Sequence, residues 1–290
     1  MDFYLTAILQ ALCFSALALG IFISMKIFNI PDITTDGSFT LGGAITAVLI
    51  TKGFPGPLVL SLVMLAGATA GAITGLIHTK LKINPLLAGI LVMTALYSVN
   101  LSLMGRSNIP LLNYPTFFSS LALTGDLNID SFILLFLFVS LLIGIIGYIL
   151  KTDFGIAMRA TGNSESMIRA LGVNTDRMKV IGLALANCLT AISGYLITQF
   201  QGFADINMGI GIVIAGLGSV IIGEALIYWF KWTSVWGNLL LVIAGAVLFQ
   251  AVLAATLSIG IDPNLLKLVT AVFVLLIVSL PKIFSFSRYA

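Results

Sequence analysis

Charged residues and the side chains that carry most catalysis are scarce in this chain of 290 residues. Asp, Glu, Lys and Arg together make up 9% of it, and it contains one histidine and two cysteines. A soluble globular domain carries about 25% charged residues, so the composition leaves no room for a large soluble domain. The net charge of +3 is small and dispersed, which argues against a nucleic-acid-binding protein.

Catalytic and metal-binding motifs are absent as well. No Walker sequence GxxxxGK[ST] occurs, so ATP hydrolysis is not expected of this chain. There is no HExxH, no cysteine–histidine cluster and no GxSxG elbow to support metal catalysis or serine hydrolysis. Cys13 and Cys188 lie in apolar stretches, and His78 stands at the end of another, as an interface residue would. We therefore expect no enzyme activity, no metal site and no cofactor bound by this chain itself.

Apolar residues dominate what is present, at 59% of the chain with a mean hydropathy of +1.14. An α-helix needs about 20 apolar residues to cross a bilayer, so the sequence predicts an all-α, polytopic membrane protein. The first apolar stretch is a full span that ends near Lys26, so we expect no cleaved signal peptide. We predict nine spans, at residues 3–28, 37–51, 55–78, 85–104, 130–150, 178–200, 209–230, 236–257 and 264–281.

Basic residues predict the orientation of these spans. The polar segment 151–179 holds five of the fourteen lysines and arginines, so we place it in the cytoplasm. Eleven basic residues then lie inside and three, Lys52, Arg106 and Lys267, lie outside. This predicts an N-terminus outside, a C-terminus in the cytoplasm and a main outer loop at 105–130. The inner set comprises Lys26, Lys80, Lys82, Lys151, Arg159, Arg169, Arg177, Lys179, Lys231, Lys282 and Arg288.

Two pairs of segments resemble each other and predict an internal repeat. ALCFSALALG (11–20) resembles ANCLTAISGY (186–195), and PDITTDGSFTLGGAI (31–45) resembles ADINMGIGIVIAGL (204–217). Under the predicted orientation the two copies are inverted, which places a translocation route at their interface. We predict a single transmembrane domain, 1–290, with a 4+1+4 arrangement. Its parts are a first repeat at 3–104, a connecting span at 130–150, a cytoplasmic coupling segment at 151–177 and a second repeat at 178–281.

The segment 151–179 predicts a short helix on the cytoplasmic side. Asn163 or Ser164 can cap its start, and Gly172 can end it in a left-handed conformation. Apolar residues fall on one face at helical spacing, which suits docking into a groove of a soluble partner. An ordinary helical loop fits these residues equally well. The candidate docking residues are Arg159, Gly162, Asn163, Ser164, Glu165, Met167, Ile168, Arg169, Leu171 and Gly172.

Polar residues near spans 2 and 7 are the candidates for contact with a transported solute. Span 2 is short and follows the polar run IPDITTDGS, and span 7 is rich in glycine, a pattern typical of broken helices around a pathway. For Asp36, capping of its own helix fits as well as solute contact. The candidates for the pathway are Asp36, Ser38, Thr40, Asn100, Asn187, Asp205, Asn207 and Gly209.

Small residues also predict where helices approach closely. Gly67, Gly71 and Gly75 fall four apart along the third span and form one stripe. The stripe predicts a packing face either within the monomer or between two monomers.

The run TDFGIAMRATGNSESMIRALGVNTDRMKVIGLALANCLTAISG (152–194) resembles the cytoplasmic signature of permeases in the branched-chain amino acid and ribose ABC-transporter superfamily. The N-terminal ALALGIFISMKIFNIPDITTDGSFTLGGA also resembles the first-span signature of that family. Departures around Met167, Ile168 and 34–36 leave the solute open, and the pattern is closest to single-permease systems for amino acids, aromatic ones among them. The matching signature positions are Thr152, Gly155, Arg159, Ala160, Gly162, Asn163, Gly172 and Gly194.

The resemblance implies a type II-like importer permease in the bacterial cytoplasmic (inner) membrane. Two copies, most simply a homodimer, would form the pore in the lipid, and each would dock residues 163–172 into a separate ATP-binding subunit that holds ATP and magnesium. An extracytoplasmic solute-binding protein would deliver the solute. The alternative is an ion-coupled secondary transporter, for which Asp36, Asp205 and Glu224 are the only plausible acids. A lipid-modifying membrane enzyme is a third alternative, without a recognisable catalytic set.

Overall fold

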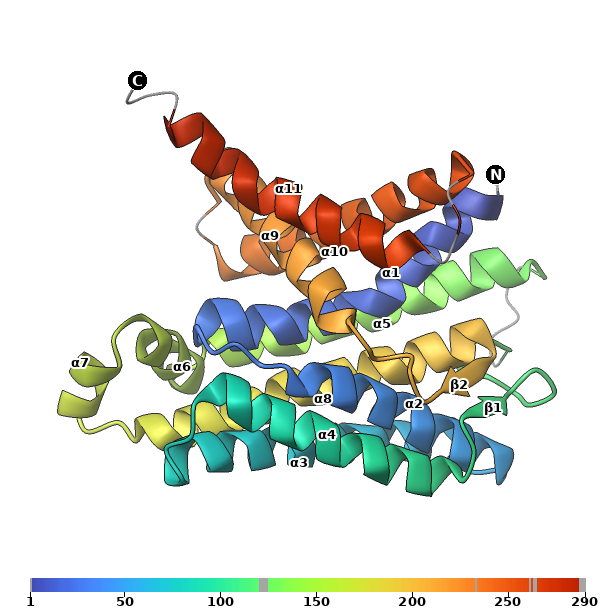
Figure 1. The fold of residues 1–290 in the computed structure, drawn as a ribbon, viewed down its shortest axis with the longest axis horizontal. Coiled ribbons are helices and arrows are strands. Elements are labelled where there is room, and N and C mark those ends of the chain that lie inside the picture. The colour runs from blue at the N-terminus through green and yellow to red at the C-terminus, as the bar shows by residue number, and fades with distance from the viewer. Residues whose placement is uncertain (1, 120–124, 233, 261, 263–264, 287–290) are drawn as a thin grey trace.

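The structure, a computed structural model, describes residues 2–119, 125–232, 234–260, 262 and 265–286. Most of it is helical, because apolar segments in lipid must satisfy their backbone hydrogen bonds internally. Two short strands, β1 (Asn108–Pro110) and β2 (Phe203–Asp205), pair antiparallel (Figure 1). The helices are α1 (Asp2–Ile21), the π-helix η1 (Phe22–Ile27), α2 (Thr34–Thr51), α3 (Gly56–Lys80), α4 (Pro85–Met104), the 3-10 helix η2 (Phe117–Ser119), α5 (Leu127–Lys151), α6 (Asp153–Asn163), α7 (Glu165–Ala170), α8 (Thr175–Gln201), α9 (Ile212–Phe230), α10 (Val235–Ser258) and α11 (Leu266–Phe286).

Seven helices within the described residues are long and apolar enough to cross a membrane: α1 with η1, α3, α4, α5, α8, α9 and α10. This confirms an all-α, polytopic protein. α2 and α11 lie at the other two predicted spans. The first turn of α2 is polar, and the apolar stretch of α11 in the described chain is Leu268–Ile277. Membrane crossing by these two helices stays a prediction.

The centre of the bundle is made by α1 and α8. In their most apolar windows 78% and 72% of residues are buried, against 22% in α4 and 28% in α9. The two helices run in opposite directions side by side (Figure 1). Ser193 Oγ of α8 donates a hydrogen bond to the Cys13 carbonyl of α1 at 2.8 Å. The bond satisfies a hydroxyl group that would have no partner in lipid. Both cysteines are free, as expected of residues inside apolar helices.

The glycine stripe of α3 packs within the monomer. A Cβ atom added at Gly71 would meet the Leu183 carbonyl of α8, and one added at Gly75 would meet the Val180 backbone. Gly67 faces the same helix one turn away, at Asn187 and Ala191. The absent side chains let the two backbones approach closely, which is how helices gain van der Waals contact in a membrane.

The first turns of α2 and α9 meet inside the bundle. Irregular backbone at residues 28–33 precedes α2, and turns at residues 206–211 precede α9. The Gly209 amide donates to Thr40 Oγ1 at 3.1 Å, which fixes the second of these segments against α2. Non-helical backbone at membrane depth is tolerated only where protein surrounds it or where it lines a cavity. The predicted breaks at spans 2 and 7 are therefore present, and α9 begins at Ile212 rather than at 209.

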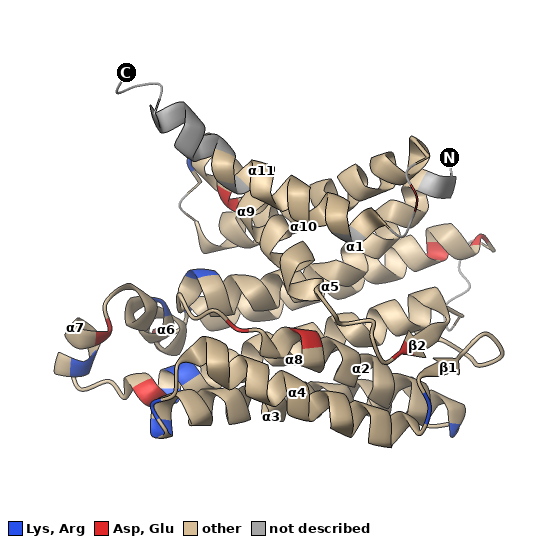
Figure 2. Ribbon diagram, in the orientation of Figure 1, with Lys and Arg blue, Asp and Glu red and all other residues tan. Residues whose placement is uncertain are grey.

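Basic residues are distributed unevenly between the two ends of the bundle. Most lysines and arginines lie at the end that carries α6 and α7, and few lie at the end that carries β1 and β2 (Figure 2). The strand pair had no signal in the sequence; it joins the predicted outer loop to the segment before α9, with Asn108 opposite Asp205. Residues 120–124 of that loop, and Arg288 of the predicted inner set, lie outside the described residues.

Substitution at Gly71 tests the contact of α3 with α8. Gly71→Ala places a methyl group against the Leu183 carbonyl, and overpacking of this kind costs about 1–3 kcal/mol. We expect the thermal unfolding midpoint of the purified protein in detergent to fall by about 2–4 °C per kcal/mol. Gly144→Ala on α5 is the matched control, because nothing lies within 4 Å of its added Cβ. An equal loss in both variants would contradict the packing assigned to this stripe.

Candidate functional site

Asp36 is the residue on which the meeting of α2 and α9 depends. It lies in the first turn of α2, yet its carboxylate does not cap that helix in the described contacts. Its Oδ2 accepts from the Gly211 amide at 2.8 Å and its Oδ1 from the Val213 amide at 2.9 Å, so it caps α9 instead. A carboxylate at a helix N-terminus satisfies free N–H groups and opposes the positive end of the helix dipole. The expectation that Asp36 caps its own helix was therefore wrong in its choice of helix.

A small cavity of about 30 Å³ opens beside this contact. A space of this size is close to that of one water molecule. It lies between α2, α4 and the segment that precedes α9. Its lining includes the predicted pathway residues Asp36, Thr40 and Asn100, but the apolar side chains were not predicted. The lining residues are Asp36, Gly37, Thr40, Met93, Tyr97, Asn100, Ile206 and Ile210.

Asn100, one of the lining residues, carries a buried polar atom without a partner among the described residues. Its side chain is 1% exposed, and its Nδ2 donates to the Gly37 carbonyl at 3.2 Å. Because a carbonyl can only accept, this bond fixes which way the amide points. The Oδ1 atom accepts no hydrogen bond from any described residue. A buried acceptor left without a donor costs about 1–3 kcal/mol.

A second polar network lies behind α2, against α8. Asn187 Nδ2 donates to Asp32 Oδ2 at 2.7 Å, and Ser38 Oγ donates to Asn187 Oδ1 at 2.7 Å. The Thr34 amide donates to the other oxygen of Asp32 at 2.9 Å. Ser38 and Asn187 are thus fully engaged in joining α2 to α8, and neither lines the cavity. Asp32, which is 1% exposed, was missed as a site residue although the run PDITTD contained it.

The other predicted pathway residues lie in separate contacts. Asp205 belongs to β2, where its Oδ1 accepts from the Asn207 amide at 2.8 Å and its Oδ2 from Asn108 at 3.4 Å. Gly209 lies against Asp36 and Thr40, where a Cβ would strike both. Glu224 pairs with Lys26 at 3.1 Å at the far end of α9. The three acids that an ion-coupled carrier would need are therefore held in three separate contacts.

The predicted coupling segment forms two helices instead of one. α6, which precedes the short helix α7, was not predicted. Thr152 caps the start of α6, where its Oγ1 accepts from the Gly155 amide at 3.3 Å. Asn163 ends α6, and Ser164 stands at the N-cap of α7 without a side-chain hydrogen bond, so the predicted cap was wrong. Gly172 follows α7 with φ +86°, as predicted for a left-handed stop.

The apolar stripe of α7 is divided between two directions. Met167 and Leu171 are 62% and 69% exposed, whereas Ile168 is 9% exposed and packs inward. The single predicted docking face is thus corrected to two exposed side chains and one buried anchor. Gly162 of α6 contacts the Ile27 backbone with no room for a Cβ, and its carbonyl accepts from Asn29 Nδ2 at 3.1 Å. Arg159 lies on an exposed face of α6.

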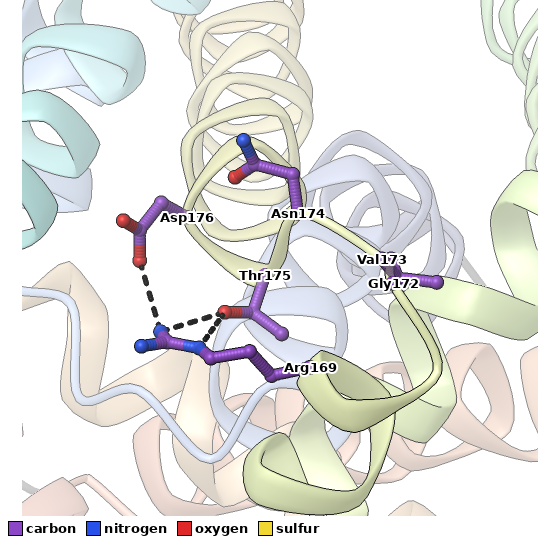
Figure 3. A pocket seen from close by; sticks show the side chains of 6 residues that line it. All are labelled: Arg169, Gly172, Val173, Asn174, Thr175 and Asp176. Carbon is purple, nitrogen blue, oxygen red and sulfur yellow. Dashed lines mark hydrogen bonds and ion pairs between the residues drawn. The ribbon is translucent and has the colours of Figure 1, made fainter.

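Charged side chains tie α7 to the start of α8. Glu165 Oε2 accepts from Lys179 Nζ at 2.6 Å and Glu165 Oε1 from Arg169 at 2.7 Å. Arg169 also donates to Thr175 Oγ1 at 2.9 Å and lies 3.4 Å from Asp176 (Figure 3). Chiefly through its hydrogen bond with Lys179, the pKa of Glu165 is held below its usual range. A hollow of about 350 Å³ lies beside this cluster, lined by Arg169, Gly172, Val173, Asn174, Thr175 and Asp176.

Known proteins identify the family of this chain. Residues 3–279 match the family model described as branched-chain amino acid transport system / permease component. The chain belongs to this permease family. The match confirms the resemblance drawn from the sequence. The permease is a subunit of an ATP-binding-cassette importer that takes up small solutes.

Individual relatives cover most of the permease. It is 38% identical over 266 residues to a tyrosine transport system permease protein of Clostridioides difficile, covering 92% of this chain and 87% of that protein. An uncharacterized protein of Rickettsia prowazekii is 35% identical over 274 residues, which cover 94% of this chain and 95% of that protein. A galactofuranose transporter permease protein of Escherichia coli is 28% identical over 252 residues, which cover 84% of this chain and 69% of that protein. No solved structure matches.

Substitution of Asp36 tests its role in capping α9. Asp36→Ala leaves two N–H groups of α9 without their acceptor, which costs about 1–2 kcal/mol. We expect segment 206–211 to exchange its amide hydrogens at least about fivefold faster, and solute uptake to fall. Asp126→Ala is the matched control, since Asp126 caps α5 through Asn128 at 3.0 Å, away from the cavity. Faster exchange at 206–211 in both variants would contradict a local role for Asp36.

The charged link between α7 and α8 predicts a charge-reversal experiment. Lys179→Glu should loosen α7 and raise amide exchange over residues 165–171 by about two- to fivefold, the range for a partly exposed pair. Combining it with Glu165→Lys should restore part of the protection, because the swapped pair can form again while Lys at position 165 then meets Arg169. Because the pKa of Glu165 is lowered in the folded state, its contribution is present above about pH 4.5, the ordinary value. The difference between Glu165→Gln and the unaltered protein should therefore shrink as pH falls below that value, and a constant difference would contradict the link.

Proposed function

We propose that this permease forms the translocation path for an amino acid, with an aromatic one as the first choice. One relative, named a tyrosine transport system permease protein, aligns over 92% of the permease at 38% identity. The path runs between α2 and α9 at the level of Asp36. The observation that carries this proposal is the capping of α9 by a carboxylate of α2, since it joins the starts of two interrupted helices at one cavity.

The proposed architecture has nine spans, arranged as four, one and four. Helices α2 and α11 complete the set of seven apolar spans. The antiparallel course of α1 and α8, each followed by an interrupted segment and a helix that starts inside the bundle, supports an inverted repeat (Figure 1). The first repeat is 3–104, the connector 130–150, the coupling segment 151–177 and the second repeat 178–281. The concentration of Lys and Arg at the α6–α7 end supports an inner location for that end, with the N-terminus outside and the C-terminus in the cytoplasm (Figure 2).

The proposed partners follow from the two ends of the bundle. A separate ATP-binding subunit, which carries ATP and magnesium, docks on α7, where Met167 and Leu171 offer an exposed apolar contact. The neighbouring salt bridges hold α7 on α8, so a displacement of α7 is passed to a membrane helix. A solute-binding protein delivers the amino acid at the β1–β2 end, and a second copy of the permease completes the pore as a homodimer in the lipid.

Paired substitutions test the docking of the ATP-binding subunit. Met167→Asp with Leu171→Asp should reduce both co-purification of that subunit and energised uptake of labelled tyrosine by at least about tenfold, since central apolar contacts dominate docking energies. Leu112→Asp is the control, because this residue is 83% exposed and follows β1, which lies at the opposite end of the bundle from α7 (Figure 1). Full uptake by the double variant would refute docking at α7. Uptake by the purified permease alone, driven by an ion gradient without nucleotide, would refute the proposed function.

A further inference from the structure

A hollow of about 320 Å³ lies between the end of α3 and the start of α8. Both helix termini belong to the end of the bundle that carries α6 and α7 (Figure 1). Leu76 and Lys80 line the hollow from α3 and are four residues apart, so they follow one face of that helix. Arg177 and Ile181 line it from α8 with the same spacing. The space between these two faces is the α3–α8 hollow.

Two basic side chains in the α3–α8 hollow have no acidic partner. Lys80 and Arg177 are both exposed, and neither forms an ion pair with any described residue. Asp176 is the one acid among the described residues that line the hollow, and its carboxylate lies 3.4 Å from Arg169, outside this lining. Two basic groups therefore face one acid that is already paired. The net positive charge of the lining attracts an anion.

The deeper part of the lining is apolar. Leu76 is 46% exposed and Ile181 is 41% exposed, and both belong to helices that are long and apolar enough to cross a membrane. Each lies one helical turn from the basic residue of its own helix, in the direction of the middle of the span. The hollow is thus cationic at the helix ends and apolar towards the bilayer. A molecule with an anionic head and apolar chains matches both parts.

An acidic side chain of the ATP-binding subunit is the other anion that could reach Lys80 and Arg177. The exposed apolar residues assigned to docking, Met167 and Leu171, do not line the α3–α8 hollow. A soluble subunit also leaves the two apolar lining residues uncovered, because they belong to the membrane-spanning part of the helices. Basic pockets between membrane helices on the cytoplasmic side bind anionic lipid headgroups, which long basic side chains reach by extending to the interface. The lipid therefore accounts for more of the lining.

We propose that the α3–α8 hollow binds an anionic phospholipid, with its phosphate between Lys80 and Arg177 and its acyl chains along Leu76 and Ile181. The inference goes beyond the proposed function and rests on it only for the orientation, which assigns the lipid to the inner leaflet. The bound lipid joins the last turn of α3 to the first turn of α8, close to the ion pair that fastens α7 to α8.

Native mass spectrometry of the complete transporter tests this site. The transporter is released from a neutral detergent that contains equal amounts of phosphatidylglycerol and phosphatidylcholine with the same acyl chains. The ratio of the two lipids is measured in the ions that keep one lipid. The unaltered transporter should prefer phosphatidylglycerol. Lys80→Gln and Arg177→Gln should each lower this preference about fivefold, the factor for one basic residue beside an anionic lipid surface.

The matched control is Lys82→Gln. This residue is exposed and lies two positions beyond Lys80, but it does not line the hollow, so its replacement should leave the preference unchanged. Arg177→Lys keeps the charge and should keep the preference, which separates charge recognition from damage to the fold. An equal fall in the Lys80, Arg177 and Lys82 variants would reduce the effect to general surface charge and overturn the proposal. Absence of any preference in the unaltered transporter, as expected if the ATP-binding subunit fills the hollow, would also overturn it.

Soluble anions separate a lipid site from a site for free phosphate. Glycerophosphoglycerol, which is the headgroup without acyl chains, and inorganic phosphate are each added to the same mixture. Neither should displace phosphatidylglycerol at about a hundredfold molar excess, because every buried methylene of the acyl chains adds to the binding energy. Displacement by either compound would assign the hollow to a soluble phosphate and overturn the lipid site.

Uptake of labelled tyrosine by the same proteins in liposomes separates this inference from the proposed function. Uptake that requires ATP, without the lipid preference, would refute the lipid site alone. The preference, together with uptake that does not require ATP, would refute the importer mechanism proposed above and leave the lipid site standing.

Discussion

The structure depends on a carboxylate that belongs to one half of the chain and caps a helix of the other. Asp36 of α2 accepts from the Gly211 and Val213 amides at the start of α9, 175 and 177 residues further along the sequence. A helix that begins inside a membrane has free N–H groups that lipid cannot satisfy. Because Asp36 of α2 supplies the acceptor, the start of α9 depends on the position of α2. The small cavity lies beside this contact, between α2, α4 and the segment that precedes α9.

The described contacts divide the polar residues of the membrane region into two groups with different consequences. Asp32, Ser38 and Asn187 satisfy one another and fasten α2 to α8. Asp36 and Thr40 on the opposite side of α2 accept from amides of the segment that leads into α9. A fully connected buried network rigidifies a structure. One short helix thus bonds α8 through one face and the start of α9 through the other, which explains why so many of its residues are polar.

The sequence predicted the class of fold and much of its layout because hydropathy and charge act locally. Runs of apolar residues place helices at all nine predicted ranges, and Gly172 ends α7 as its position suggested. Contacts between distant residues were not accessible in this way. The choice of α9 as the helix that Asp36 caps, the pairing of β1 with β2 and the inward turn of Ile168 each depend on tertiary packing. Asp32 was not among the predicted pathway residues, because nothing in a single sequence distinguishes a buried aspartate from a cap in a polar loop.

Helix α8 makes polar contacts with other elements at its start, its middle and its end. At its start Lys179 holds Glu165 of α7, at its middle Asn187 holds Asp32, and near its end Gln199 accepts from the Phe117 amide of η2 at 2.7 Å. Its 27 residues make a rod about 40 Å long. A rod gripped at its centre moves its two ends in opposite directions when it tilts. A displacement of the α7 end of α8 would therefore also move η2, which lies at the opposite end of the helix.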